Sequence, residues 1–181
     1  MRTIFIVFFS TFVMHAQEFN REIILDNGKQ FLVGKITLQR LNTEPYKAWY
    51  NTAHESYAVD QAMVQLFKNK LSDYKILLFL GTWCGDSKRE VPRFIKILEA
   101  ADYSLENLSI VALDRRKEFY KKSPTGEEKG LNIIKVPTFI FYKDGIEINR
   151  IVESPIESLE EDITAIVGNK TYTPNYTQGR K

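Results

Sequence analysis

The apolar residues of this chain follow two patterns, short continuous runs and helical spacing. Residues 75–80 and 108–113 are nearly unbroken apolar runs, which are typical of strands buried on both faces. Between them, residues 87–101 are predicted to form an amphipathic helix, because apolar side chains recur at i, i+3, i+4 and i+7. These side chains are Val91, Phe94, Ile95 and Leu98. Two further strands are expected over 138–142 and 146–152, on either side of the turn Lys143-Asp144-Gly145.

The N-terminal third of the chain predicts a hairpin followed by helical segments. A hairpin is expected over 22–36, because Asn27-Gly28 separates two β-rich runs. Residues 44–56 are aromatic-rich and are expected to form a helix or an irregular segment over the core. Residues 57–71 predict a helix, whose apolar side chains at near-helical spacing are Ala62, Leu66 and Phe67.

The last predicted element is a C-terminal helix. Ser154 is its expected N-cap, Pro155 its first residue and Gly168 its end. Its apolar face consists of Ile156, Leu159, Ile163 and Ile166. The order of strands and helices predicts an α/β fold, a three-layer sandwich in which helices cover both faces of a central mixed sheet.

Residues 1–16 have the layout of a secretory signal peptide. A basic Arg2 is followed by an apolar run of about a dozen residues, and polar sequence begins just after Ala16. The run is shorter than the roughly 20 apolar residues that span a bilayer. Cleavage is expected after Ala16, which would give an exported chain, periplasmic or extracellular, with no membrane attachment after cleavage. The alternative is a buried N-terminal strand or helix.

Composition excludes several classes of protein. Of the 181 residues, 44% are hydrophobic and 27% charged, with a net charge of +2, so no strong field indicates a nucleic-acid partner. The chain has one cysteine and two histidines, which excludes an intramolecular disulfide and argues against a structural zinc site. There is no glycine-rich phosphate loop, and no cofactor or metal is expected.

The single cysteine, Cys84, lies between a predicted buried strand and a predicted helix. The first N–H groups of a helix lack partners and carry the positive end of its dipole, which favours a nucleophilic thiolate. Ser87, one turn further on, is expected to donate a hydrogen bond to the sulfur, whereas the carboxylate of Asp86 opposes the thiolate. The alternative is that Cys84 is a small buried apolar residue.

The segment Trp83-Cys84-Gly85-Asp86-Ser87 resembles the active-site segment Trp-Cys-Gly-Pro-Cys of the thioredoxin superfamily. Further segments fit in the same order, namely Pro92 in the following helix, Ile134-Lys135-Val136-Pro137-Thr138-Phe139 and Phe141-Tyr142-Lys143-Asp144-Gly145. The resemblance implies a thioredoxin-like domain over 57–168, an N-terminal hairpin and aromatic-rich extension over 17–56, and a flexible tail over 169–181. It also implies that Pro137 is cis and faces Cys84.

This resemblance implies a groove for an extended substrate, formed by Trp83, Gly85, Asp86, Val136 and Pro137. The second cysteine of the superfamily motif is Ser87 here, its proline is Asp86, and the buried acid six residues before the first cysteine is Leu78. The site is therefore expected to be a monothiol Cys-x-x-Ser site.

Such a site predicts thiol–disulfide exchange through Cys84 as nucleophile. Cys84 would form a mixed disulfide with a client protein or a small thiol, and an external thiol would resolve it. One alternative is a non-catalytic binding module that uses the same groove. A weaker alternative is glutathione-like transfer.

The other chemically interesting side chains have simpler interpretations. Glu90 and Glu99 are expected on the solvated face of a helix, and His54 is expected to be structural rather than a base. Arg115-Arg116-Lys117 and Lys121-Lys122 are expected to be wet surface, with binding of an anionic ligand as the alternative. The aromatic residues of the extension are expected to belong to the core rather than to a peptide-binding face; they are Tyr46, Trp49 and Tyr50.

Overall fold

The computed structural model describes residues 19–176. The predicted signal peptide, its cleavage site after Ala16 and the last residues of the predicted tail, 177–181, lie outside the described residues.

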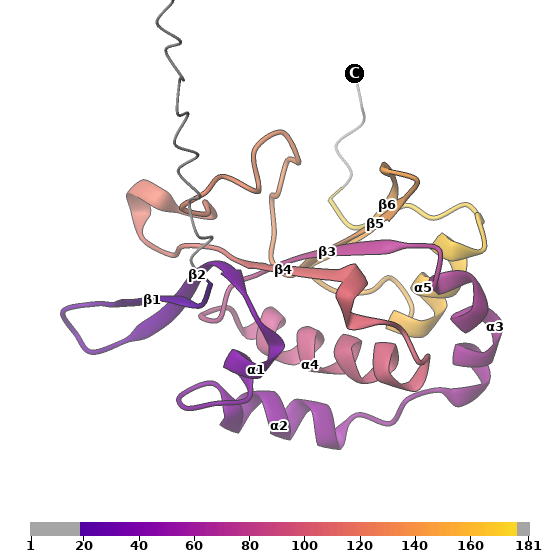
Figure 1. The fold of residues 1–181 in the computed structure, drawn as a ribbon, viewed down its shortest axis with the longest axis horizontal. Helices are drawn as coiled ribbons and strands as arrows, with labels where there is room; N and C mark the ends of the chain where they lie inside the picture. Colours follow the sequence, from indigo (N-terminus) through magenta and orange to yellow (C-terminus); the bar gives the residue numbers. More distant parts are fainter. Residues whose placement is uncertain (1–18, 177–181) are drawn as a thin grey trace, which may run out of the picture.

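A six-stranded mixed sheet forms the centre of the fold (Figure 1), in the order β1-β2-β4-β3-β5-β6. Strands β3 and β4 are parallel, and all other neighbouring strands are antiparallel. The strands are β1 Arg21–Ile24, β2 Gln30–Ile36, β3 Lys75–Leu80, β4 Leu108–Ala112, β5 Thr138–Lys143 and β6 Ile146–Val152. Every predicted strand is confirmed, and so is the α/β fold class with its central mixed sheet.

Helices cover one face of the sheet. Alternate residues of β3, namely Ile76, Leu78 and Leu80, belong to the large core cluster that includes the buried faces of α3, α4 and α5. Helix α2 packs against α4, and in Figure 1 both lie below the sheet, while α3 and α5 lie at its right-hand end. The helices are α1 Leu38–Leu41, α2 Lys47–Ser56, α3 Gln61–Leu71, α4 Gly85–Ala100 and α5 Leu159–Val167, with short 3-10 helices η1 Leu105–Asn107 and η2 Lys117–Phe119.

The opposite face of the sheet is covered by a long connection between β4 and β5. Leu77 and Phe79 of β3 point to this face and contribute to a second, smaller cluster. The connection supplies Leu131, Ile133 and Val136 to it and contains η2. Irregular chain therefore forms most of the layer for which the sequence predicted helices.

The N-terminal segment is an integral part of the sheet rather than an extension beside it. Strand β2 pairs with β4 through the register Gly34 to Ala112, Lys35 to Val111 and Ile36 to Ile110. The aromatic residues that follow behave as predicted, because Tyr46 and Tyr50 are buried and Trp49 packs against the same core. The predicted boundary at residue 56 therefore has no counterpart in the packing.

The C-terminal helix starts later than the sequence predicted. Ser158, not Ser154, is its N-cap: the Ser158 hydroxyl accepts a hydrogen bond from the Glu161 N–H at 3.1 Å, in a capping box with the Glu161 side chain. The predicted first turn is instead held outside the helix, since the Ile156 N–H donates to the buried carboxylate of Asp162 at 2.8 Å. The end at Gly168 is confirmed.

The part of the predicted flexible tail that the structure describes is anchored. The Tyr172 hydroxyl donates to Asp162 at 2.7 Å, and its carbonyl accepts from the Asn149 side chain of β6 at 3.0 Å. Asn175 donates to the Ser154 carbonyl at 3.0 Å. Residues 169–176 therefore pack along β6 and α5, because polar side chains fix a segment that lacks apolar ones.

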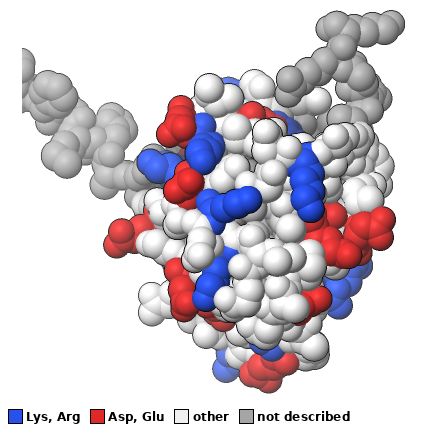
Figure 2. Space-filling view, turned by 90° about the vertical axis from the view of Figure 1, so that its right-hand side faces the viewer, with Lys and Arg blue, Asp and Glu red and all other residues white. Residues whose placement is uncertain are grey.

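Charge is spread evenly over the side of the molecule that carries α3 and α5. Figure 2 shows Lys and Arg side chains interspersed there with Asp and Glu. This distribution agrees with the small net charge of +2 and gives this side no field of a single sign.

The burial of two leucines gives a matched test of the fold. Leu98 in α4 is fully buried, whereas Leu66 in α3 is 63% exposed, although the sequence placed Leu66 on the buried face. We expect Leu98→Ala to lower the free energy of unfolding by about 2–5 kcal/mol, because it leaves a cavity. Leu66→Ala is expected to change it by less than about 0.5 kcal/mol. Urea denaturation of both variants measures the difference, and equal losses would contradict the described packing.

Candidate active site

Cys84 is the N-cap residue of α4. It has extended backbone angles, φ −90° and ψ 132°, and its carbonyl accepts the first helical hydrogen bond from the Lys88 N–H at 3.1 Å. The residues Gly81-Thr82-Trp83 connect it to the end of β3, and the Cys84 N–H closes this turn on the Gly81 carbonyl at 2.8 Å. Cys84 is partly exposed, so the interpretation as a sealed apolar residue does not fit.

The Cys84 sulfur faces the segment that precedes β5. Its thiol donates to the Val136 carbonyl at 3.3 Å, and the Val136–Pro137 peptide bond is cis, the conformation that the resemblance implied. Pro137 is buried, and its carbonyl accepts from the Glu153 N–H at 2.7 Å. The structure therefore brings together Cys84, Val136 and Pro137, three of the predicted site residues.

Ser87 lies elsewhere than predicted. Its side chain is fully buried, and its hydroxyl accepts a hydrogen bond from the Gly81 N–H at 3.1 Å. The hydroxyl serves this turn because the Gly81 N–H is buried and needs an acceptor. The predicted hydrogen bond from Ser87 to the sulfur is therefore wrong, and Ser87 supports the turn that carries Cys84.

Trp83 forms a wall of the site. Its indole N–H donates to the Leu113 carbonyl at 2.8 Å, and its ring covers Gly81 so closely that an added Cβ would lie 2.7 Å from Cε2. The ring of Tyr120 lies against it, with centroids 5.7 Å apart. Gly81 is therefore required by this close approach.

Gly85 and Asp86 border the sulfur on the solvent side. Gly85 is exposed, and an added Cβ there would meet no atom within 4 Å, so the approach to this side of Cys84 is open. The Asp86 carboxylate lies 4.0 Å from the sulfur through one oxygen and pairs with Arg89 at 2.9 Å through the other. The Arg89 guanidinium thus neutralises part of the charge that would oppose a thiolate.

The three other acid–base candidates are structural. Glu90 is buried and pairs with Arg89 at 2.5 Å and Arg93 at 3.6 Å, so its predicted place on a solvated face is wrong. The chain after α2 covers this side of α4, and Arg93 lies over the Tyr57 ring. The pair His54–Glu99, at 2.8 Å, ties α2 to the exposed side of α4, in line with the structural role expected of His54.

Sequence reasoning missed two residues beside the site, Tyr120 and Lys121. Lys121 is partly buried and its ammonium donates to the Ile134 carbonyl. It is close enough to Cys84 for the ammonium and a thiolate to attract each other. The signal was the basic and aromatic run Phe119-Tyr120-Lys121-Lys122, which the sequence alone could not distinguish from ordinary surface. By contrast, Arg116 is paired with the buried Asp114 at 2.6 Å.

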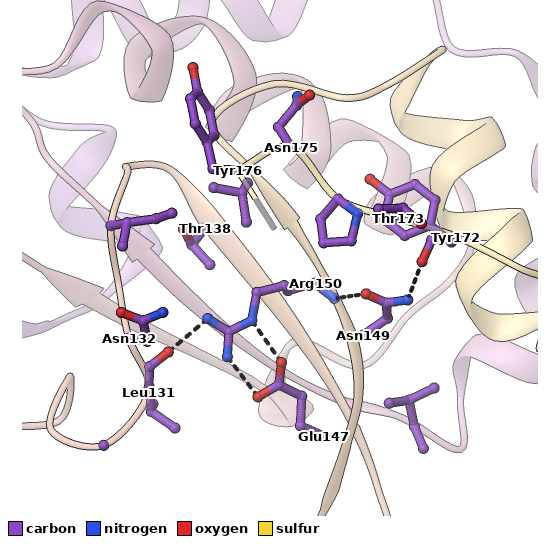
Figure 3. Close-up of a pocket in the computed structure, with 15 residues that line it drawn as sticks. Leu131, Asn132, Thr138, Glu147, Asn149, Arg150, Tyr172, Thr173, Asn175 and Tyr176 are labelled. Atoms are coloured by element: carbon purple, nitrogen blue, oxygen red, sulfur yellow. Dashed lines mark hydrogen bonds and ion pairs between the residues drawn. The ribbon is translucent and has the colours of Figure 1, made fainter. Parts of the chain in front are cut away.

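A separate pocket of about 510 Å³ lies along β6 and is drawn in Figure 3. Its polar side chains are engaged with one another, as the figure shows for Arg150, which pairs with Glu147 at 2.7 Å and donates to the Leu131 carbonyl at 2.7 Å. Its lining includes neither Cys84 nor Trp83. Because it holds no nucleophile, we place the candidate chemistry at Cys84.

Within residues 19–176, no group of three or more His, Cys, Asp or Glu side chains is arranged to hold a metal ion. In the same part of the chain, no helix has the length and apolar character needed to cross a membrane.

A family model described as Thioredoxin matches residues 36–165, and the chain belongs to this family. Thioredoxin H9 of Arabidopsis thaliana is 29% identical over 104 residues, which cover 56% of this chain and 67% of that protein. Thioredoxin H-type of Populus jackii is 31% identical over 97 residues, which cover 52% of this chain and 63% of that protein. The protein is thus a thioredoxin-like protein with a single cysteine.

Two solved structures are also similar. Mitochondrial thioredoxin 3 of Saccharomyces cerevisiae, in its oxidised form, is 27% identical, covers 49% of this chain and 76% of that chain, and has a TM-score of 0.32. A Pseudomonas aeruginosa protein of unknown function is 12% identical, covers 70% of this chain and 82% of that chain, and has a TM-score of 0.46.

The corrected role of Ser87 is testable by Ser87→Ala. We expect this variant to lose about 1–3 kcal/mol of unfolding free energy, because the buried Gly81 N–H is left without an acceptor. The rate at which iodoacetamide alkylates Cys84 in the folded protein is expected to change less than about twofold, because the hydroxyl does not contact the sulfur. Ser104→Ala is the control, since Ser104 is exposed and makes no capping hydrogen bond. A large fall in alkylation rate at unchanged stability would restore the predicted contact between Ser87 and the sulfur.

Proposed function

We propose that this protein performs thiol–disulfide exchange through the single nucleophile Cys84. The observation that carries the proposal is the position of the sulfur, partly exposed at the start of α4 and 3.3 Å from the carbonyl that precedes cis-Pro137. A disulfide arriving from the open side at Gly85 can reach the sulfur. The backbone of Val136 beside it can hydrogen-bond an extended client segment.

The start of α4 favours the reactive form of the thiol. When Cys84 loses its proton to solvent, the hydrogen bond to the Val136 carbonyl is lost as well. The unpaired N–H groups of the first helical turn then stabilise the negative charge. The Lys121 ammonium attracts the same charge, and Asp86 is partly neutralised by Arg89.

The exchange proceeds in two steps that balance. The Cys84 thiolate attacks one sulfur of a client disulfide, forming a Cys84–client disulfide, and the other client sulfur leaves as a thiolate. An external thiol, from a small molecule or a second protein, then attacks the mixed disulfide and releases Cys84. Ser87 cannot take this second role, because it carries a hydroxyl and is buried against Gly81.

The proposed site of action is outside the cytoplasm, periplasmic or extracellular. The support is the signal-peptide layout of residues 1–16. Disulfides persist in such compartments, so client disulfides are available there. The proposed partners are client proteins and small thiols, with no nucleic acid and no membrane attachment of the mature chain.

The experiment is to trap mixed disulfides in the native cells. We expect a non-reducing gel of alkylated extracts to show adducts of the wild-type chain that disappear on reduction, because no internal thiol resolves them. Cys84→Ser is the matched control and should show none. Mass spectrometry of the adducts names the clients. If wild-type chain forms no adducts while both proteins retain the same non-covalent partners, the chain is a binding module rather than an exchange protein.

A further inference from the structure

The connection between β4 and β5 builds a fixed position for Lys121 at the edge of the Cys84 site. The chain turns back after η2, where the Lys121 N–H donates to the Asp114 carbonyl at 2.9 Å and the Lys122 N–H to the Phe119 carbonyl at 2.8 Å. Lys121 takes a φ of 56° in this turn. Its ammonium then donates to the carbonyl of Ile134, two residues before Val136.

The Lys121 ammonium has no carboxylate partner within the described part of the chain. None of the ion pairs among residues 19–176 includes Lys121. Glu153 is nearby, but its carboxylate is engaged by Lys135 at 2.8 Å and by the Tyr176 hydroxyl. Burial, together with the charge of Lys135, lowers the pKa of Lys121. The site therefore holds a partly buried positive charge that a bound anion would stabilise.

Exposed apolar side chains surround this charge. Phe119 is 49% exposed, Tyr120 51% and Ile134 38%, and Tyr120 lies against the Trp83 ring. An apolar rim next to a cation suits a peptide segment with side chains of both kinds better than a small inorganic anion.

We infer that Lys121 recognises a carboxylate of the client, so that the site prefers extended segments with Asp or Glu two residues from the reacting cysteine. A client strand that pairs with the Val136 backbone continues past Ile134, where the Lys121 ammonium lies. Residues two apart on a strand are separated by about 6.6 Å and point to the same side. This inference rests on the proposed function and names its substrate class.

The test uses short synthetic peptides, each with one cysteine held as a mixed disulfide with thionitrobenzoate. Cys84 attacks the peptide sulfur, a Cys84–peptide disulfide forms, and the coloured thionitrobenzoate anion leaves with the bonding electrons. The peptides carry Glu or Gln two residues before or after the cysteine. We expect the Glu peptide to react roughly three to five times faster than the Gln peptide in at least one of these positions. The preference should shrink in about 1 M salt, where charges are screened beyond roughly 3 Å.

The decisive readout is the ratio of Glu to Gln rates rather than either rate alone, because Lys121 also acts on the Cys84 thiolate. Lys121→Gln should bring the ratio close to one. Lys122→Gln, the matched control, removes the neighbouring exposed charge and should preserve the ratio. A ratio near one in wild-type protein, or an equal loss in both variants, overturns the inference and leaves the proposed function intact.

A second arm distinguishes a small anionic thiol from a peptide client. It uses the thionitrobenzoate disulfides of a small carboxylate thiol and of its amide. If the Lys121-dependent preference is as large with these as with the peptides, the peptide assignment is wrong. If no disulfide reacts faster with Cys84 than with free cysteine, the proposed function itself fails, and this inference with it.

Discussion

The site depends on the pairing of three buried strands. β3 is parallel to β4 and antiparallel to β5, with Leu80 opposite Ala112 and Phe79 opposite Thr138. The chain that leaves β3, the chain that leaves β4 and the chain that enters β5 therefore meet at one edge of the sheet. Cys84 and Val136, 52 residues apart in sequence, come within hydrogen-bond distance for this reason, and Lys121 reaches the same edge.

Much of this arrangement could be predicted from local patterns. The continuous apolar runs of β3 and β4, the period of α4 and the Asn27-Gly28 turn each have one favourable structure, and all of them form. The position of Cys84 between a buried strand and an amphipathic helix followed directly from these elements. Family motifs added the partner segment around Pro137, which no periodicity indicates.

The errors concern side chains with more than one satisfactory partner. The hydroxyls of Ser87, Ser154 and Ser158 can each cap or brace a nearby backbone group, and only the folded chain decides which N–H group is buried without an acceptor. Lys121 is similar, because a lysine in a polar loop looks like solvated surface until the loop folds back onto the cis-proline segment. Tertiary contacts select these roles, and a single sequence carries no record of them.

The central claim is that the fold activates and exposes the sulfur of Cys84. It is tested most directly by the rate at which iodoacetamide alkylates Cys84 at neutral pH in the folded protein and in the same chain unfolded in urea. A cysteine-containing model peptide in both solvents corrects for the effect of urea. The account predicts that folding raises the rate roughly threefold or more, because α4 and Lys121 favour the accessible thiolate. A rate equal to or below that of the unfolded chain would contradict it.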